Sequence, residues 1–131
     1  MQRPIAGIAV DAAHSLKNGK TEYQGINIAS GERIFYRDLG NQTTNIGEFL
    51  AIIAAVKYII ENDFQPRVIY SDSTTAITWF NAQKTSSSKS FSELQKAEMF
   101  LRALSYDIET IKVLYWDNKS WGETPADFNR K

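Results

Sequence analysis

The sequence predicts an α/β domain with a five-stranded mixed sheet, in which an antiparallel meander of three strands precedes two parallel strands and helices cover both faces. Three observations lead to this class. Short apolar runs separated by turn signals occupy residues 5–39. A long helical stretch, apolar nearly all round, comes next. After it, two further apolar runs alternate with segments of helical spacing, as in parallel strands joined by crossover helices.

The first three elements are expected to be strands joined by short turns. Residues 5–10 form a continuous apolar run that is typical of a buried strand, and we expect this strand to end at Asp11. Residues 23–29 alternate in character, as in a strand with one covered face. Residues 33–39 follow a Ser-Gly-Glu turn. Because turns this short join antiparallel neighbours, the sequence predicts a meander.

The main helix is expected to begin at Asn45 and to run to about Asn62. Asn45 with Glu48 three residues later matches the reciprocal capping pattern of helix starts. Pro66 prevents the helix from continuing. A helix that is apolar on nearly every side should be packed between other elements.

From residue 67 onward, the sequence pattern predicts two parallel strands and three helices. The strands are expected at 67–70 and 110–116, and the helices at 73–80, 91–104 and from Thr124 onward. Pro125 suits the first turn of the last helix. Residues 84–90 are small, polar or basic and predict a flexible loop.

Composition limits the possible functions. The chain has 131 residues, and its 15 basic and 15 acidic side chains give a formal net charge of zero. Any polyanion must therefore be met by local lysines or by bound cations. The absence of cysteine excludes a disulfide scaffold, a cysteine nucleophile and a zinc–cysteine site. The longest apolar stretch, 49–60, is shorter than the roughly 20 residues of a membrane span. We expect a single domain over 1–131 that is monomeric, cytoplasmic and not bound to membranes.

Three acidic residues are predicted to meet at one edge of the sheet. Asp11 and Asp72 each follow a strand, and the two strands are expected to be parallel neighbours whose carboxyl ends share an edge. Glu48 shares a helical stripe with Ile52 and Ile59, so it should face the sheet. Each acid also has an ordinary alternative role, as a strand end, a helix cap or a capping-box partner. The convergence of all three favours a site.

Such a site needs compensation for its charge. Three carboxylates without a basic partner repel one another, so either one of them holds a proton or a cation lies among them. Oxygen ligands alone, without cysteine or suitably spaced histidines, point to a hard ion such as Mg²⁺ or Mn²⁺. Because Mg²⁺ commonly shares its ligands between carboxylates and phosphate oxygens, the pattern predicts phosphate chemistry.

Four segments of the chain form a recognisable set: Ile8-Ala-Val-Asp11, Thr43-Thr-Asn-Ile-Gly-Glu-Phe-Leu-Ala51, Ile69-Tyr-Ser-Asp-Ser73 and Gly122-Glu-Thr-Pro-Ala-Asp127. Together they resemble the type 1 ribonuclease H family. Each match is short, but their order and the elements between them also fit, over essentially the whole chain. The resemblance implies the ribonuclease H-like fold.

The resemblance also implies an activity and a set of catalytic residues. By similarity, two divalent ions, Mg²⁺ or Mn²⁺, would be held by Asp11, Glu48, Asp72 and Asp127. The implied enzyme is an endoribonuclease that hydrolyses the RNA strand of RNA–DNA hybrids and leaves 5′-phosphate and 3′-hydroxyl ends. Two ions about 3.5–4 Å apart activate a water and stabilise the leaving oxygen in such reactions.

Further residues are implied as contacts to the hybrid. Asn45 resembles the family's contact to the 2′-hydroxyl, the group that distinguishes RNA from DNA. Thr43, or Thr44 in its place, resembles part of the family's DNA-phosphate pocket. The other candidates are Ser73, Trp79, which could stack on a sugar or a base, and Lys84 and Lys89 of the serine loop, which stands where many bacterial members have a basic protrusion.

The chain departs from the family before the last acid. Members often have a histidine there, whereas this sequence has none between Trp116 and Asp127. The candidate substitutes are Glu123 and the single histidine of the chain, His14. Two alternatives to the ribonuclease remain open: a hybrid-binding module without activity, and another nuclease of the same fold, of the resolvase or transposase type.

Overall fold

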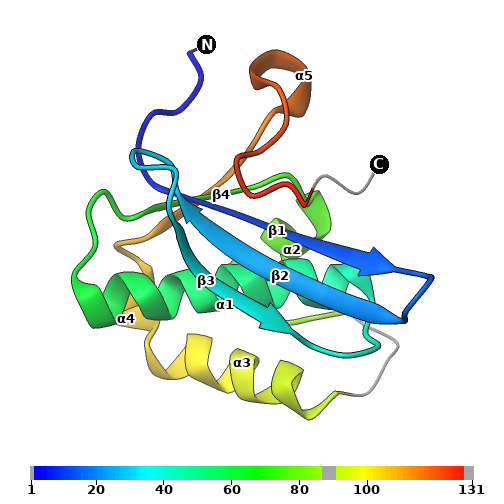
Figure 1. Ribbon diagram of the computed structural model, residues 1–131. Helices are drawn as coiled ribbons and strands as arrows, with labels where there is room; N and C mark the ends of the chain where they lie inside the picture. Colours follow the sequence, from blue (N-terminus) through cyan, green and yellow to red (C-terminus); the bar gives the residue numbers. More distant parts are fainter. Residues whose placement is uncertain (1, 87–90, 129–131) are drawn as a thin grey trace.

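The computed structural model describes residues 2–86 and 91–128 and confirms the five-stranded mixed sheet (Figure 1). The strands are β1 (Ile8–Ser15), β2 (Lys20–Asn27), β3 (Arg33–Asp38), β4 (Val68–Ser71) and β5 (Lys112–Tyr115). Their order in the sheet is β3-β2-β1-β4-β5. The first three strands are antiparallel, and β4 pairs in parallel with both β1 and β5.

Helices lie on both sides of this sheet. They are α1 (Thr44–Asn62), α2 (Thr74–Ala82), α3 (Ser92–Ala103), α4 (Ser105–Ile108) and α5 (Asn118–Trp121). Figure 1 shows α1, α3 and α4 on one side, and α5 with the C-terminal segment on the other. Trp121 of α5 stands edge-on to Tyr70, which alternates along β4 with the buried Ile69. Among the described residues, no helix combines the length and the hydropathy that crossing a bilayer requires.

The core forms where α1 packs on β1 and β4. Ile8 and Ile69 of the sheet are fully buried, as are Ile52 and Ile59 of the helix. Burying an aliphatic side chain of this size contributes about 1.5–3 kcal/mol. Because α1 contacts three strands and also α2 and α3, nearly every side of it is covered. This explains its almost continuous apolar sequence.

The first strand is longer than the sequence predicted. β1 continues through Asp11 to Ser15, because β2 pairs with it along its whole length. The prediction that the strand ends at Asp11 is therefore wrong. The pairing of β1 with β4 ends at this point, since Val10 of β1 and Ser71 of β4 are the last register partners. Beyond Val10, the edge of β1 that faced β4 is open.

The start of α1 also differs from the prediction. The N-cap is Thr43, whose Oγ1 accepts a hydrogen bond from the backbone N–H of Ile46 at 3.2 Å. Asn45 lies inside the first turn and is exposed, so the expected pairing of Asn45 with Glu48 in a capping box is wrong. Glu48 is thus not used in capping the helix.

The last predicted helix, from Thr124, is not formed within the described residues. The helical turn lies earlier, in α5, because the side chain of Asp117 accepts from the backbone N–H groups of Lys119 and Ser120. Residues 122–128 instead form a turn and irregular chain. Ala126 packs there against the sheet, on the face opposite α1. The short helix α4 was not predicted.

Candidate metal centre

Asp11, Glu48 and Asp72 lie together where β4 ends and β1 continues alone. One carboxylate oxygen from each residue lies within 4.8 Å of those from the other two. Asp11 and Asp72 directly follow the register partners Val10 and Ser71, so parallel pairing places them side by side. The structure thus brings these three predicted residues to one point.

Glu48 reaches this point because α1 approaches the sheet closely at Gly47. A Cβ on Gly47 would stand 2.9 Å from the Cβ of Ala12 and 3.1 Å from the Cγ2 of Thr21, so glycine is needed here. The Oε1 of Glu48 accepts from the backbone N–H of Ala12, on the open part of β1, at 3.0 Å. Its Oε2 is buried and has no hydrogen-bond donor among the described residues. The carboxyl group of Asp11 can form a hydrogen bond with the Oε2 of Glu48 only if one of the two acids keeps a proton.

Burial makes the ionised form of this cluster unfavourable. Loss of solvent raises the pKa of Asp11 and of Glu48 above their ordinary values. The negative charge of Asp72 raises the pKa of both groups further, and that of Asp127 raises the pKa of Asp11. Without a cation, Asp11 and Glu48 therefore hold a proton more readily than ordinary carboxyl groups do, and a bound cation would favour its loss.

The donors around the cluster fit a hard divalent ion. Two neutral groups donate hydrogen bonds to the cluster: the Ala12 backbone N–H donates to Glu48, and the Asn118 amide donates to Asp72. In the chain as described (2–86, 91–128), no ion pair involves the three acids. Carboxylate oxygens, one of them unsatisfied, are the ligands that Mg²⁺ and Mn²⁺ prefer. We conclude that the residues present suit a divalent metal.

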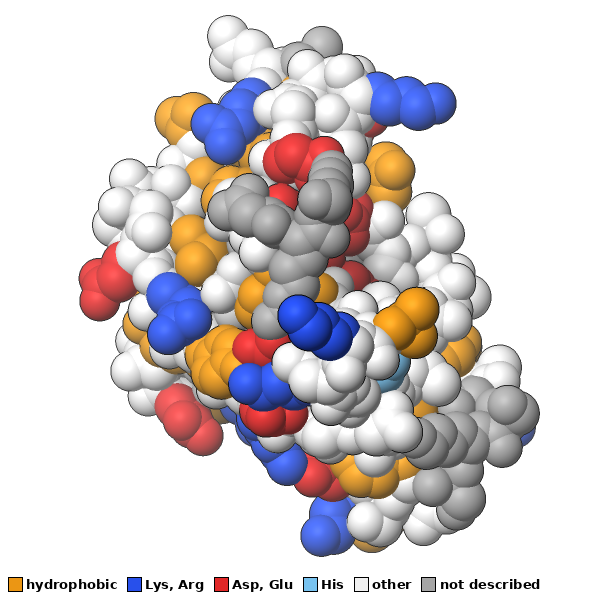
Figure 2. Space-filling view, turned by 45° about the vertical axis from the view of Figure 1, so that its right-hand side comes forward, with side chains coloured by type: hydrophobic (Ala, Val, Ile, Leu, Met, Phe, Trp, Pro, Cys, Tyr) orange, Lys and Arg blue, Asp and Glu red, His pale blue; other side chains and the backbone are white. Residues whose placement is uncertain are grey.

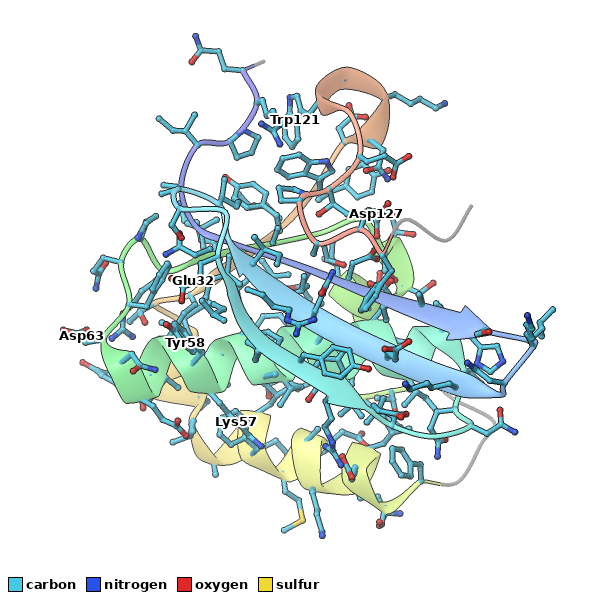
Figure 3. All side chains as sticks on the ribbon, in the orientation of Figure 1. Glu32, Lys57, Tyr58, Asp63, Trp121 and Asp127 are labelled. Carbon is cyan, nitrogen blue, oxygen red and sulfur yellow. The ribbon has the colours of Figure 1, made fainter. Side chains whose placement is uncertain are left out.

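Asp127 lies beside the group of three and is not a member of it. Its charge nevertheless contributes to the raised pKa of Asp11, so it is near enough to influence the site. Figure 3 shows Asp127 on the C-terminal segment, above the sheet. This segment is attached to β2 through Gln24, whose Nε2 donates to the carbonyl oxygen of Ala126 at 2.6 Å.

Asn118 is a site residue that the sequence reasoning missed. Its Nδ2 donates to the Oδ2 of Asp72 at 3.0 Å, and its Oδ1 accepts from the backbone N–H of Thr124 at 3.2 Å. A signal for it was present: Asn118 comes soon after β5, the parallel neighbour of β4, and therefore at the same edge of the sheet as Asp72.

The candidate hybrid contacts at the helix starts have different surroundings. Thr43, Thr44 and Asn45 are exposed at the beginning of α1. Thr43 is already used as the helix cap. Ser73 has the same use in α2, where its Oγ accepts from the backbone N–H of Ala76 at 3.1 Å. Thr44 and Asn45, in contrast, do not cap their helix within the described residues.

The expectation that Trp79 stacks on the nucleic acid is wrong. Trp79 is buried on the inner side of α2, edge-on to Phe49 with 5.9 Å between ring centroids. Trp116 is fully buried. Lys84 is exposed after α2, whereas Lys89 lies outside the described residues.

Neither substitute for the missing histidine joins the three acids. His14 Nδ1 lies 2.7 Å from the Oγ1 of Thr21, whose hydroxyl donates to the Gln42 carbonyl oxygen at 2.5 Å. Because that hydroxyl proton is already used, the proton between the pair must come from Nδ1. Side chains also alternate between the two faces of a strand. His14, three residues after Asp11, therefore points to the opposite face of the sheet. Glu123 is exposed in the segment 122–128.

On the face in Figure 2, the described lysines and arginines are dispersed among acidic and uncharged side chains and form no continuous basic area. This agrees with the zero net charge of the chain. A polyanion would therefore depend on local contacts at this face.

Comparison with known proteins identifies the fold. No protein-family model matches the sequence. A ribonuclease H1 isolated from compost by a metagenomic approach superposes with a TM-score of 0.59 at 12% identity, covering 86% of this chain and 84% of that chain. Its complex with an RNA/DNA hybrid gives 0.56 at 12% identity, over 86% of both chains. The N-terminal RNase H domain of a Mycobacterium tuberculosis protein, fused to maltose-binding protein, gives 0.52 at 13%, over 84% and 86%. The chain therefore has the fold of type 1 ribonuclease H structures.

Proposed function

We propose that this chain is a metal-dependent endoribonuclease that hydrolyses the RNA strand of RNA–DNA hybrids. The observation that carries the proposal is the cluster of Asp11, Glu48 and Asp72, which has no cationic partner among the described residues. It lies in a fold shared with ribonuclease H structures, one of which contains an RNA/DNA hybrid. One buried acid can be a structural residue, but three converging carboxylates, two of them buried, are stable together only with protons or a cation.

The four acids share one role in this proposal: Asp11, Glu48, Asp72 and Asp127 would hold two ions, Mg²⁺ or Mn²⁺. When bound, such ions supply an activated water and stabilise the departing 3′ oxygen, so that the products carry 5′-phosphate and 3′-hydroxyl ends. The chain itself would supply ligand oxygens in fixed places, and ion binding would favour the ionised forms of Asp11 and Glu48. Gly47 keeps α1 close enough for Glu48 to take part.

Recognition of the RNA strand is assigned to the start of α1. Asn45 is exposed one turn before Glu48, so its amide can reach a group beside the scissile phosphate. An amide both donates and accepts, as the 2′-hydroxyl does. Thr44 is the neighbouring candidate for a phosphate contact. We propose that the chain acts as a monomer.

A cleavage assay tests the proposal. RNA labelled in an RNA–DNA hybrid is incubated with the full chain and Mg²⁺ or Mn²⁺, beside single-stranded RNA, duplex RNA, duplex DNA and a four-way DNA junction. We expect cleavage of the hybrid's RNA strand alone, and none after chelation by EDTA. Cleavage of the junction would indicate a resolvase-type nuclease. Binding of the hybrid without metal-dependent cleavage would indicate a binding module and contradict the proposal.

A further inference from the structure

We propose that Asn118 is a positioning residue, whose side-chain amide holds Asp72 and the segment leading to Asp127 in a fixed relation and thereby sets the affinity for divalent ions. This inference rests on the proposed function of the same site. It concerns a residue that does not itself need to touch the ions or the hybrid.

The two hydrogen bonds of Asn118 determine the orientation of its amide. An ionised Asp72 can only accept, and the backbone N–H of Thr124 can only donate. The Nδ2 must therefore face Asp72, at 3.0 Å, and the Oδ1 must face Thr124, at 3.2 Å. With both ends engaged, the amide fixes one oxygen of Asp72 relative to the loop after β5.

A neutral donor is suited to this task. A lysine or arginine beside Asp72 would orient the carboxylate but would also cancel the charge that attracts a cation. An amide orients the Asp72 carboxylate without cancelling its charge, as polar groups that hydrogen-bond to metal ligands commonly do. The donor to Glu48, the backbone N–H of Ala12, is neutral as well.

The bond to Thr124 extends the influence of Asn118 toward the fourth acid. Thr124 is buried, its Oγ1 accepts from the backbone N–H of Ala126 at 3.3 Å, and its carbonyl oxygen accepts from that of Asp127 at 3.0 Å. The position of Asn118 thus bears on the backbone of Asp127 as well as on Asp72.

Asn118 is itself held by a firm element. It is the first residue of α5, which Asp117 caps. At the other end of α5, Trp121 packs on the fully buried Trp116, with 5.2 Å between ring centroids. The indole N–H of Trp116 donates to the Gly122 carbonyl oxygen at 2.9 Å. The amide of Asn118 therefore projects from the start of a helical turn that is anchored on the sheet.

Titration of Mn²⁺ into the metal-free full chain tests this inference without an activity assay. We expect Asn118→Ala to bind Mn²⁺ about tenfold more weakly than the wild type, the lower end of the effect of losing a group behind a metal ligand. The matched control is Asn62→Ala, since the Asn62 amide donates to the Tyr58 carbonyl oxygen at the exposed end of α1. Its affinity should equal that of the wild type. Thermal unfolding verifies that each variant is folded, and Asn118→Leu, closer to asparagine in volume, replaces Asn118→Ala if the latter is not.

Equal Mn²⁺ affinity of the wild type and Asn118→Ala would overturn this inference and leave the proposed function standing. A wild type that does not bind Mn²⁺ would overturn the proposed function, and the inference with it. A double-mutant cycle with Asp72→Ala adds a second measurement, in urea unfolding of the metal-free chain. Asn118→Ala should change the unfolding constant several-fold less when Asp72 is absent. The same change in both backgrounds would show that Asn118 does not act through Asp72.

Discussion

Asp11, Glu48 and Asp72 face one another with neutral hydrogen-bond donors beside them, and this arrangement has opposite effects on folding and on ion binding. Without a cation, the like charges and the loss of solvent weaken the folded state. With a cation, the same charges become ligands. Substitutions that remove one charge should therefore separate stability from activity.

Asp72→Asn should show this separation. The asparagine can still accept from Asn118 through its Oδ1, but it removes the charge that raises the pKa of Asp11 and Glu48. We expect cleavage of the hybrid to fall about 100- to 1,000-fold, the size of losing one group that stabilises charge in the transition state, while the free energy of unfolding in EDTA rises by about 1 kcal/mol.

The control for this prediction is Asp63→Asn. Asp63 lies at the end of α1, with its side chain 82% exposed and paired with Arg67. Its substitution should leave hybrid cleavage unchanged. An Asp72→Asn variant that is less stable than the wild type in EDTA would contradict the repulsion on which the prediction depends.

At the level of the elements, α1 does two things at its first turns: Thr43 caps it, and Gly47 lets it approach the sheet. Neither structural role falls on a proposed site residue, since Glu48 is the proposed metal ligand and Asn45 the proposed RNA contact. Four neighbouring positions should therefore respond differently to substitution.

Gly47→Ala should move the helix away from β1. The added Cβ would meet Ala12 and Thr21 at 2.9 and 3.1 Å, and both belong to the packed sheet. Overpacking of this kind costs about 1–3 kcal/mol, against a gain of about 1 kcal/mol from the better helix propensity of alanine. We expect a net loss of stability in urea unfolding and weaker Mn²⁺ binding, because Glu48 is withdrawn. A variant that gains stability and keeps its Mn²⁺ affinity would show that the contact at Gly47 is not tight.

Thr43→Ala and Asn45→Ala form a matched pair. Loss of the Thr43 cap should lower the free energy of unfolding by about 1 kcal/mol. Asn45→Ala should leave it within about 0.5 kcal/mol, because Asn45 is exposed. Hybrid assays should show the reverse order, with Asn45→Ala losing its preference for an RNA strand over the same strand containing 2′-deoxy positions. Unchanged preference in Asn45→Ala would remove this residue from the site.

For the whole molecule, the buried acids make stability depend on pH and on metal together. Asp11 and Glu48 have pKa values raised above their ordinary values of 3.8 and 4.5. At a pH between the ordinary and the raised values, the folded chain binds more protons than the unfolded chain. Stability is then lost as pH rises through this interval.

Urea unfolding from about pH 5 to pH 8 should reveal this loss in EDTA. The pKa values of Glu93 and Asp117 are lowered, so these two groups contribute stability that is lost as pH falls through their folded pKa values. This loss lies mainly below the interval from about pH 5 to pH 8. Saturating Mg²⁺ should flatten the profile, because the ion replaces the protons, and an ion at 100 times its dissociation constant adds about 2.7 kcal/mol. Glu48→Gln should flatten the profile in EDTA as well. A wild-type profile that rises with pH in EDTA would contradict the raised pKa values.

Local patterns in the sequence were enough to predict the order of the strands and the main helices, and the meeting of Asp11, Glu48 and Asp72. Apolar periodicity distinguishes strand from helix within a few residues. The rule that parallel strands share an edge then relates Asp11 to Asp72 without any coordinates. The helical repeat, in the same way, turns Glu48 toward the sheet.

Other features depended on contacts between distant parts of the chain. β1 continues past Asp11 because β2 supplies its partners, and Trp79 is buried because α1 lies against α2. Asn118 reaches Asp72 across 46 positions of sequence. Hydrogen bonding and packing of this kind depend on which surfaces meet after folding. Residue type and spacing therefore predict the strands and the longer helices, while the tertiary structure decides the short helices, the point where each element ends and the side chains that complete the site.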